Sequence, residues 1–406
     1  MRSKIHIFTK DTSPVLLGII VFFLVGGIIV TIFLLDSNPV DEILSNDQVI
    51  SVLYVIEKNQ KPLCTYVLMC YPQTKKAVIY DIPEELGMLI RKINRIDRID
   101  TVYNPNDITN YKLEINRLLG VDITFFIAAN TENIGKAVDI IEGVELFIPA
   151  SVSIHDEDEL VLFPSGINRL DGDKAVSYIS FSAPDEESEM AVSRRQQFFL
   201  GFLKRQAEMN EMLKISSVSQ MYQSFLRTDL NQHSLVRLLD IFSGIDIDRI
   251  NIQLVGGNMR EVSGKMLLIP YFDGSLVKDI VRQVLTTLTD TDDSSMGVRV
   301  FTVDILNGTS VTGLAGRTAE VLRGFGYDII TVKNADHSGY EKTVIIDRSG
   351  YEAAAKKFAD IIRCNNIRQE YSGNEEPAEA VQNFEYKSDF ILIIGRDFNG
   401  RYVTGN

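Results

Sequence analysis

The most constraining feature of the sequence is an uninterrupted apolar stretch near its start. Residues 14–35 read PVLLGIIVFFLVGGIIVTIFLL and include no charged side chain. At about 1.5 Å per helical residue, this stretch matches the roughly 30 Å hydrocarbon core of a bilayer. A secretory signal peptide has a shorter apolar core followed by small residues, whereas Asp36, Ser37, Asn38 and Pro39 follow here. The sequence therefore predicts one transmembrane helix over residues 14–35.

The charges that flank this stretch predict its orientation. Arg2, Lys4 and Lys10 precede it, and acidic residues beginning with Asp36 follow it. Because the cytoplasmic flanks of membrane helices carry an excess of Lys and Arg, residues 1–13 are expected to form a cytoplasmic tail. The predicted localisation is the cytoplasmic membrane, as a single-pass protein with its main domains outside.

Charge and cysteine content exclude several classes of partner and site. The 406 residues include 41 Lys plus Arg against 55 Asp plus Glu, a formal net charge of -14. Since non-specific binding to nucleic acid depends on clustered positive charge, no nucleic-acid partner is expected. Three cysteines, Cys64, Cys70 and Cys364, cannot form a paired framework, and the four histidines lack metal-ligand spacing.

Shifts in composition divide the remaining chain into two folded units. Residues 36–48 read as a short polar stalk, and residues 49–285 are expected to form the first domain. The acidic run TTLTDTDDSS has no apolar periodicity, which is typical of a linker, and the linker is placed at residues 286–296. Residues 297–406 then form a second, smaller domain.

Apolar periodicity predicts an α/β architecture in both units. Short β-branched runs are typical of strands, and apolar residues three and four apart are typical of helices. In the first domain, strands are expected at 49–56, 65–70, 76–82 and 123–129, and helices at 111–119, 134–141, 171–180 and 186–213. In the second, strands are expected at 298–306, 343–346 and 390–394, and helices at 314–322 and 351–362. This alternation predicts a layered α/β domain followed by a small βα-alternating domain.

Five blocks of the first domain carry a family resemblance. They are KKAVIYDIPEEL (75–86), KINRID (92–97), EINRLLGVDITFFIAANTENIGKAVDIIEGVELFIP (114–149), GINRLDGDKAVSYISFS (166–182) and the pair Arg195 and Gln196. In this order, behind an N-terminal anchor, they resemble the LytR-CpsA-Psr family of membrane-anchored bacterial envelope enzymes. Residues 300–329 and 389–397 resemble the C-terminal domain often appended to such proteins.

The resemblance implies a reaction, a cofactor and partners. Members of the family transfer an anionic glycopolymer from a polyprenyl pyrophosphate carrier to peptidoglycan, with a divalent cation such as Mg²⁺ or Mn²⁺. That chemistry needs arginine side chains for the pyrophosphate, carboxylates for the cation and an apolar trough for the lipid. The implied partners are a polyprenyl-linked or wall glycan and, through one helix, the membrane.

Several residues that this reaction requires are replaced in the chain. The family's Arg-x-Asp-Thr pattern falls on PLCT, so that Cys64 stands where the resemblance implies a metal-binding aspartate. A thiol is a poor ligand for Mg²⁺. The arginine and aspartate of the Pro-Arg-Asp pattern fall on Glu84 and Glu85, of which Glu85 keeps a carboxylate for a metal. Two further arginines are replaced by Ser180 and Ser182.

The last family motif, Asp-x-x-Arg-x-x-Arg-Gln, is kept in part. Glu189 holds its first position, Val192 replaces the middle arginine, and Arg195 and Gln196 keep the final pair. Arg194 lies roughly 200° around the helix from Val192 and is considered a partial substitute. Because a charged hydrogen bond contributes about 1.5 to 3 kcal/mol, losing four arginines costs on the order of 6 kcal/mol. We expect the fold to be retained without the family's usual pyrophosphate site.

Two hypotheses from different functional classes follow. The first is a non-catalytic or weakly active envelope module that binds lipid-linked or wall glycan. The second is an active, divergent glycopolymer transferase in which Glu85 binds the metal and Arg194 and Arg195 bind phosphate. Lys92 and Asn94 are equally consistent with ligand binding and with a solvated turn. The candidate ligand-binding residues are Glu85, Lys92, Asn94, Arg194, Arg195 and Gln196, with Glu85 as the candidate metal ligand.

Overall fold

The computed structural model describes residues 19–26, 38–149, 151–156, 159–181, 188–247, 250–289, 301–349, 352–370 and 388–404. Within these ranges, no helix combines the length and the apolar character that crossing a membrane requires. Residues 19–26 are helical, and their apolar side chains are exposed. The rest of the predicted transmembrane segment, residues 14–18 and 27–35, lies outside the described residues.

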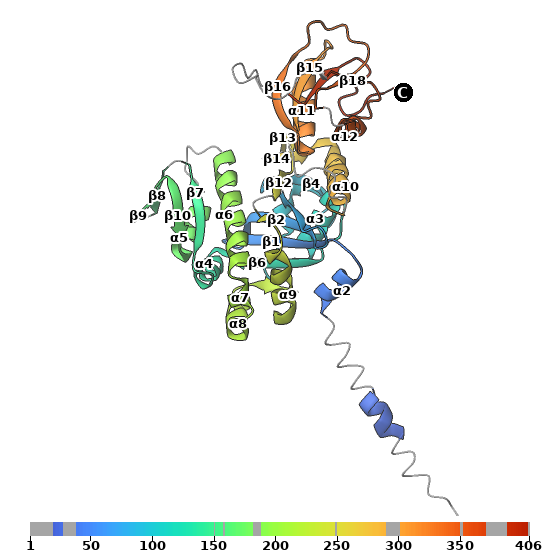
Figure 1. The fold of residues 1–406 in the computed structure, drawn as a ribbon. Helices are drawn as coiled ribbons and strands as arrows, with labels where there is room; N and C mark the ends of the chain where they lie inside the picture. Colours follow the sequence, from blue (N-terminus) through green and yellow to red (C-terminus); the bar gives the residue numbers. More distant parts are fainter. Residues whose placement is uncertain are drawn as a thin grey trace, which may run out of the picture.

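A six-stranded mixed sheet forms the centre of the first domain (Figure 1). The strand order is β11-β6-β1-β2-β3-β12. Strands β1, β2 and β3 form an antiparallel meander, β6 and β12 add in parallel to β1 and β3, and β11 adds antiparallel to β6. The bounds are β1 (Ile50–Lys58), β2 (Lys61–Tyr71), β3 (Lys76–Asp81), β6 (Phe125–Asn130), β11 (Arg227–Thr228) and β12 (Asn251–Leu254).

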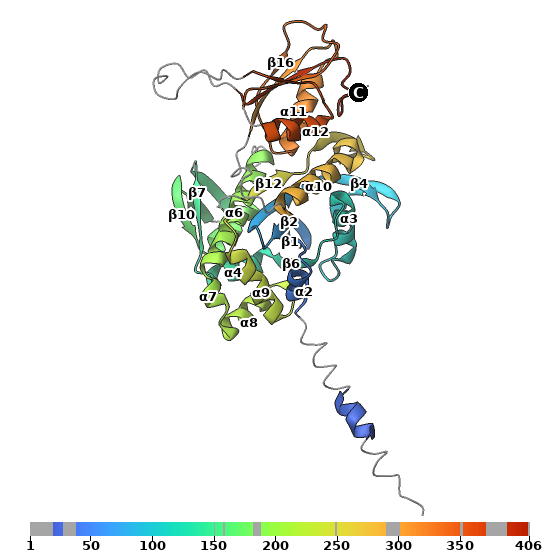
Figure 2. The ribbon, with the colours of Figure 1, turned by 45° about the vertical axis from the view of Figure 1, so that its right-hand side comes forward.

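The sheet separates two hydrophobic cores, because successive side chains of a strand point to opposite faces. Val52 and Tyr54 of β1 belong to one core, and Leu53 and Val55 belong to the other. Figure 2 shows the helices that cover the two faces. The first core is covered by α4 (Thr131–Ile140), α5 (Gly172–Ser180), α6 (Ser188–Glu208) and α9 (Gln232–Ser243), and the second by α3 (Thr109–Leu119) and α10 (Ser275–Thr289).

Side-chain caps fix where three of these helices begin. Asn130, Asp171 and Asn231 each accept a hydrogen bond from the backbone N–H three residues further along the chain. Such a cap satisfies one of the N–H groups that the first helical turn leaves without a partner. The helices α4, α5 and α9 therefore start where a short polar side chain precedes an apolar run.

Four two-stranded sheets flank the central sheet, and the sequence did not predict them. They pair β4 (Gly87–Ile90) with β5 (Arg95–Arg98), β7 (Val144–Ile148) with β10 (Gly166–Leu170), β8 (Val152–Asp156) with β9 (Glu159–Phe163), and β13 (Gly257–Val262) with β14 (Lys265–Pro270). Strand β13 is mostly exposed, and both β5 and β13 lack the alternation that identifies a half-buried strand, whereas β7 alternates strictly between buried and exposed residues. The remaining elements here are α2 (Pro39–Ser45), η1 (Ile99–Val102), α7 (Asn210–Leu213), α8 (Ser216–Ser224) and η3 (Tyr271–Gly274).

The second domain is a five-stranded sheet with the order β16-β15-β19-β17-β18. All neighbouring pairs are parallel except β17 and β19. Its core includes stacked Phe358 and Phe390, whose ring centroids lie 5.1 Å apart. The elements are β15 (Thr302–Asn307), α11 (Leu314–Gly324), β16 (Asp328–Asn334), β17 (Val344–Asp347), α12 (Glu352–Ile362), β18 (Ile367–Gln369) and β19 (Phe390–Ile394).

Helix α10 forms the contact between the two domains (Figure 1). The side chain of Ile280 packs close to Gly324 of α11. The Asp279 carboxylate accepts a hydrogen bond of 3.2 Å from the Tyr402 hydroxyl and lies 3.9 Å from the Arg401 guanidinium. The helix continues to Thr289, into the segment that the sequence assigned to a linker from residue 286. Residues 290–300 lie outside the described part of the chain.

The mixed α/β architecture with a separate C-terminal domain, which the sequence predicted, is confirmed. The predicted long helix over 186–213 is interrupted after Glu208, and its aromatic residues Phe198 and Phe199 are buried. All three cysteines are buried and none is paired. Cys64 and Cys70 both lie on β2, at positions that point to the same face.

Candidate functional site

Five side chains converge where strands β2 and β3 meet helix α6. They are Cys64, Asp81, Glu84, Arg195 and Gln196, and we call them the Arg195 cluster. Cys64 lies on β2, Asp81 ends β3, and the last two residues are neighbours on α6. Helix α6 packs into the first core through buried aromatic side chains, and this packing fixes the position of the cluster.

The Arg195 guanidinium binds three acceptors of the chain itself. Its Nη1 donates to Glu84 Oε1 at 2.9 Å and to the Leu63 carbonyl at 3.4 Å. Its Nε donates to the Ile179 carbonyl at 3.2 Å. The side chain is 14% exposed, so these contacts are partly shielded from water. The Arg195 guanidinium is therefore held by a carboxylate and two backbone carbonyls.

The two acidic residues of the cluster are easier to protonate than ordinary carboxylic acids. Burial raises the pKa of Asp81 to about 6, although Gln196 Nε2 donates a hydrogen bond of 2.7 Å to Asp81 Oδ2 and favours the charged form. Burial also raises the pKa of Glu84, while the Arg195 charge opposes that shift. Desolvation thus outweighs hydrogen bonding and ion pairing at both groups.

Cys64 takes part in the cluster as a neutral thiol. Burial raises the pKa of this thiol to about 12, so it stays protonated at neutral pH. Only a thiolate is a good metal ligand. The next residue, Thr65, shares a hydrogen bond of 2.8 Å with the Tyr111 hydroxyl, which ties β2 to α3.

Arg194 binds the end of helix α5. Its Nε donates to the Tyr178 carbonyl at 2.8 Å, and its Nη2 donates to the Phe181 carbonyl at 2.5 Å. The guanidinium also lies 5.2 Å from the centre of the Phe181 ring. A cation on the last carbonyls of a helix stabilises that helix end. The structure therefore gives Arg194 contacts that hold α5 against α6.

The other three candidate residues lie on the surface. Glu85 is exposed, and its backbone carbonyl accepts a hydrogen bond of 2.8 Å from Leu268 of β14. Lys92 and Asn94 are exposed in the turn between β4 and β5, where Asn94 has a φ of 49°. The structure thus brings Arg195 and Gln196 together and places Lys92 and Asn94 at a hairpin tip.

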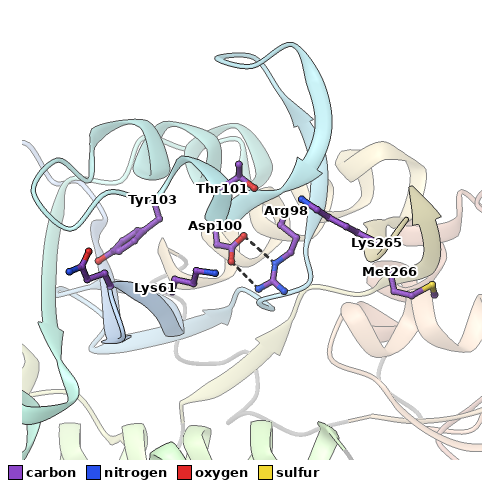
Figure 3. A pocket seen from close by; sticks show the side chains of 8 residues that line it. Lys61, Arg98, Asp100, Thr101, Tyr103, Lys265 and Met266 are labelled. Atoms are coloured by element: carbon purple, nitrogen blue, oxygen red, sulfur yellow. Dashed lines mark hydrogen bonds and ion pairs between the residues drawn. The ribbon is translucent and has the colours of Figure 1, made fainter. Parts of the chain in front are cut away.

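A cavity of about 630 Å³ is lined by residues of β2, β5, η1 and β14 (Figure 3). Arg98 connects this cavity with the Arg195 cluster, because its charge also acts on the Glu84 carboxylate. We call it the basic cavity, since three of its side chains are cations and one is a carboxylate. Its lining residues are Gln60, Lys61, Arg98, Asp100, Thr101, Tyr103, Lys265 and Met266.

The three cations of the basic cavity differ in their carboxylate partners. Arg98 donates two hydrogen bonds to Asp100, of 3.1 and 2.9 Å (Figure 3). Lys265 Nζ donates to Asp97 at 2.8 Å. Lys61 extends into the cavity from the start of β2. Arg98 and Lys265 are thus paired with carboxylates, and among the described residues Lys61 is the cation of this cavity that no ion pair neutralises.

A repeated tripeptide in the sequence points to the basic cavity. Residues 92–100 read KINRIDRID, three successive units of a basic residue, Ile and a polar residue. The first unit contains Lys92 and Asn94, the candidate residues that the family resemblance indicates. The structure places the third unit, with Arg98 and Asp100, at the cavity. Only the path of the β4–β5 hairpin distinguishes the three units.

Comparisons with known proteins identify the family. The model of the LytR-CpsA-Psr family matches residues 64–277, more than half of the chain. A second model, described as LytR cell envelope-related transcriptional attenuator, matches residues 301–398. No curated protein sequence is significantly similar to the chain. The domain with the mixed sheet and two cores is thus that of a cell-envelope protein. The chain belongs to the LytR-CpsA-Psr family and carries a LytR-type C-terminal domain.

Solved structures share the fold of the first domain at low sequence identity. TagV from B. subtilis has a TM-score of 0.52 and 15% identity, over 60% of this chain and 98% of that chain. Protein gbs0355 from Streptococcus agalactiae has a TM-score of 0.52 and 14% identity, over 62% and 91%. The transcriptional regulator (EF0465) from Enterococcus faecalis has a TM-score of 0.51 and 14% identity, over 62% and 91%. These likenesses show the fold alone.

Proposed function

We propose that the protein is a membrane-anchored envelope module that binds an anionic lipid-linked or wall glycan without transferring it. The ion pair between Glu84 and Arg195 carries this proposal. A phosphate group that approached Arg195 would have to displace a carboxylate of the same charge sign. The surviving arginine of the family motif is therefore occupied by an internal substitute for phosphate.

The donor groups of the Arg195 cluster do not fit Mg²⁺ or Mn²⁺. These cations prefer several oxygen ligands, among them ionised carboxylates. Here Cys64 is a protonated thiol, and the Asp81 and Glu84 carboxylates already bind Gln196 and Arg195. A cation would also face the Arg195 guanidinium. These donors therefore do not form a site for a divalent cation.

The basic cavity supplies the binding surface for an anionic glycan. Lys61 offers a charged hydrogen-bond donor for phosphate or carboxylate groups, whereas Arg98 already donates to Asp100. Tyr103 offers an aromatic ring, which can pack on a sugar. The cavity is open to solvent, so a polymer can lie along it without entering the core. These features support binding and do not require a reaction.

Membrane anchoring remains part of the proposal. Residues 19–26 are helical, and their side chains, among them Phe22 and Phe23, lie exposed outside both cores. An exposed apolar helix suits a lipid environment. We place the N-terminus in the cytoplasm and both domains outside, on the positive charges that precede the apolar stretch.

Two measurements on the full-length protein in detergent test the proposal. In the first, the protein is incubated with a short-chain prenyl pyrophosphate and Mg²⁺ or Mn²⁺, and cleavage of the phosphate bond is followed by mass spectrometry. We expect no cleavage.

The second measures binding of a soluble anionic wall glycan by calorimetry. We expect Lys61→Glu to weaken glycan binding about tenfold. Lys333→Glu, on β16 of the second domain, is the matched control and should bind normally.

Cleavage of the prenyl pyrophosphate that disappears in Arg195→Ala would reject the hypothesis of a non-catalytic protein. It would establish the second hypothesis, an active and divergent transferase. A wild-type protein that neither cleaves the pyrophosphate nor binds the glycan would reject both.

A further inference from the structure

A second cavity lies between the two domains and shares no lining residue with the basic cavity. Its volume is about 470 Å³, which is within the usual range for small-molecule pockets. The first domain contributes β3, β12, η3 and α10, and the second contributes the end of α11 and the residues after it. Domain interfaces are a preferred location for ligand sites. We call it the interdomain cavity.

Tyr80 of β3 supplies a polar group without a partner at this cavity. Its side chain is 2% exposed and lines the cavity. The hydroxyl is buried and has no hydrogen-bond partner among the described residues. Buried polar groups in proteins are almost always hydrogen-bonded, because desolvating one without a partner is unfavourable. Burial raises the pKa of Tyr80, so the hydroxyl is neutral and available as a donor.

Two amide side chains lie beside Tyr80. Asn251 and Gln253 alternate along β12 and therefore share one face of the strand. Gln253 is in register with Tyr80 on the neighbouring strand. Both amide groups lie close to Gly326 of the second domain. A side chain at position 326 would place its Cβ atom 3.8 Å from Asn251 Nδ2 and 3.9 Å from Gln253 Nε2. Tyr80 and the amides thus form a group of uncharged polar side chains.

The walls around these polar groups are mainly apolar. Helix α10 contributes Leu276, Val277 and Ile280, and the two domains contribute the rings of Tyr271 and Tyr327. The charged residues at the cavity include Glu320 and Arg323, which form an ion pair with each other. The lining therefore matches a molecule with an apolar body better than a charged one.

We propose that the interdomain cavity binds an uncharged small molecule with an apolar ring or chain and an acceptor oxygen for the Tyr80 hydroxyl. A carbonyl or amide group meets this requirement, because the Asn251 and Gln253 side chains offer both donors and acceptors. The walls come from both domains, so the bound molecule stabilises their contact. This site is independent of the glycan binding proposed above.

A pair of fluorinated probes tests the site on the full-length protein in detergent. The probe 4-fluorobenzamide has a ring and an amide oxygen, whereas 4-fluorotoluene has the ring alone. Binding is followed by broadening of the ¹⁹F NMR signal. We expect Tyr80→Phe to weaken 4-fluorobenzamide binding about three- to tenfold, as loss of one neutral hydrogen bond does, and to leave 4-fluorotoluene binding unchanged.

Tyr54→Phe is the matched control. The Tyr54 hydroxyl is also buried and finds no partner in the described part of the chain, but it lies in the first core and not at the cavity. This variant should bind both probes like the wild type. Ile280→Trp should fill the cavity and abolish binding of both. Absent binding of 4-fluorobenzamide, equal affinity in wild type and Tyr80→Phe, or binding that survives in Ile280→Trp would each overturn the proposal.

Discussion

The Glu84 carboxylate lies 2.9 Å from the Arg195 guanidinium, although the two residues are 111 positions apart in the chain. Glu84 stands where the family pattern has an arginine. Two arginines at this distance would repel each other unless an anion lay between them. The ion pair replaces that arrangement with one that is neutral without an external anion. The ion pair between Glu84 and Arg195 can therefore form without a bound pyrophosphate.

Glu84→Gln is expected to increase the affinity for a short-chain prenyl pyrophosphate. The substitution removes the carboxylate that occupies Arg195 and keeps the length of the side chain. One recovered arginine-phosphate hydrogen bond corresponds to about 1.5 kcal/mol, or roughly tenfold in affinity. Calorimetric titration of the purified variant measures the effect.

Glu85→Gln is the control for this experiment. The neighbouring Glu85 is exposed and is not part of the Arg195 cluster. The two substitutions make the same change of charge at adjacent positions. If both raise the affinity equally, general electrostatics explains the gain and the ion pair does not.

Asp81→Asn is expected to change how stability depends on pH. The pKa of Asp81 rises from 3.8 to about 6 on folding, so the folded state binds this proton more tightly than the unfolded state. The stability that this proton confers is present below pH 4 and is lost as the pH rises to about 6. An asparagine accepts the Gln196 hydrogen bond without a charge. The variant should gain roughly 2 to 3 kcal/mol relative to the wild type between pH 4 and 7.

Urea unfolding at pH 4, 5, 6 and 7 measures this difference. Asp273→Asn is the control, because Asp273 is exposed and the change of residue is the same. A stability difference between wild type and Asp81→Asn that stays constant over this pH range would show that Asp81 does not titrate as described.

Phe199→Ala is expected to destabilise the first domain by about 3 to 5 kcal/mol. The Phe199 ring is 1% exposed, stacks on Tyr66 at 4.3 Å and meets Tyr54 edge-on at 5.1 Å. Its removal leaves a cavity where α6 contacts the sheet. Phe147→Ala deletes the same side chain at an exposed position of β7 and should change stability by less than about 0.5 kcal/mol. Chemical denaturation compares the two variants.

Asp279→Ala is expected to loosen the contact between the domains. The variant loses the hydrogen bond from Tyr402 and the ion pair with Arg401, and the partly exposed carboxylate makes the cost about 1 kcal/mol. Differential scanning calorimetry should show the transition of the second domain separating from that of the first. Asp360→Ala, at an exposed position of α12, should leave the transitions as in the wild type. Identical traces for the two variants would contradict a role for Asp279.

The regular part of the fold could be predicted from local patterns. The helix expected at 314–322 spans Leu314–Gly324, and the strand expected at 390–394 has the same bounds in the structure. The helix has apolar residues at helical spacing, and the strand is a continuous apolar run; both patterns indicate burial. The β13–β14 sheet has mostly exposed residues on β13, so its sequence carries no such signal. Its position depends on contacts with residues far away in the chain.

The candidate site could be predicted only in part, because it also depends on contacts between residues far apart in the chain. Arg195 and Gln196 were found because a motif fixes their spacing on one helix. Their partners Asp81 and Glu84 come from a different element, and only the docking of α6 against β3 brings them within reach. Arg98 was missed because three similar tripeptides precede α3, and the sequence does not show which one faces a cavity.

The free cysteines have a consequence for how the protein is made. Cys64, Cys70 and Cys364 are 6%, 0% and 2% exposed, and none forms a disulfide. Cys64 and Cys70 are six residues apart on one straight strand, a separation of roughly 20 Å that no disulfide can bridge. Folding therefore needs neither an oxidant nor a disulfide isomerase. The three thiols of the native protein should stay unmodified under oxidising and reducing conditions alike, because they become reactive only when a domain unfolds.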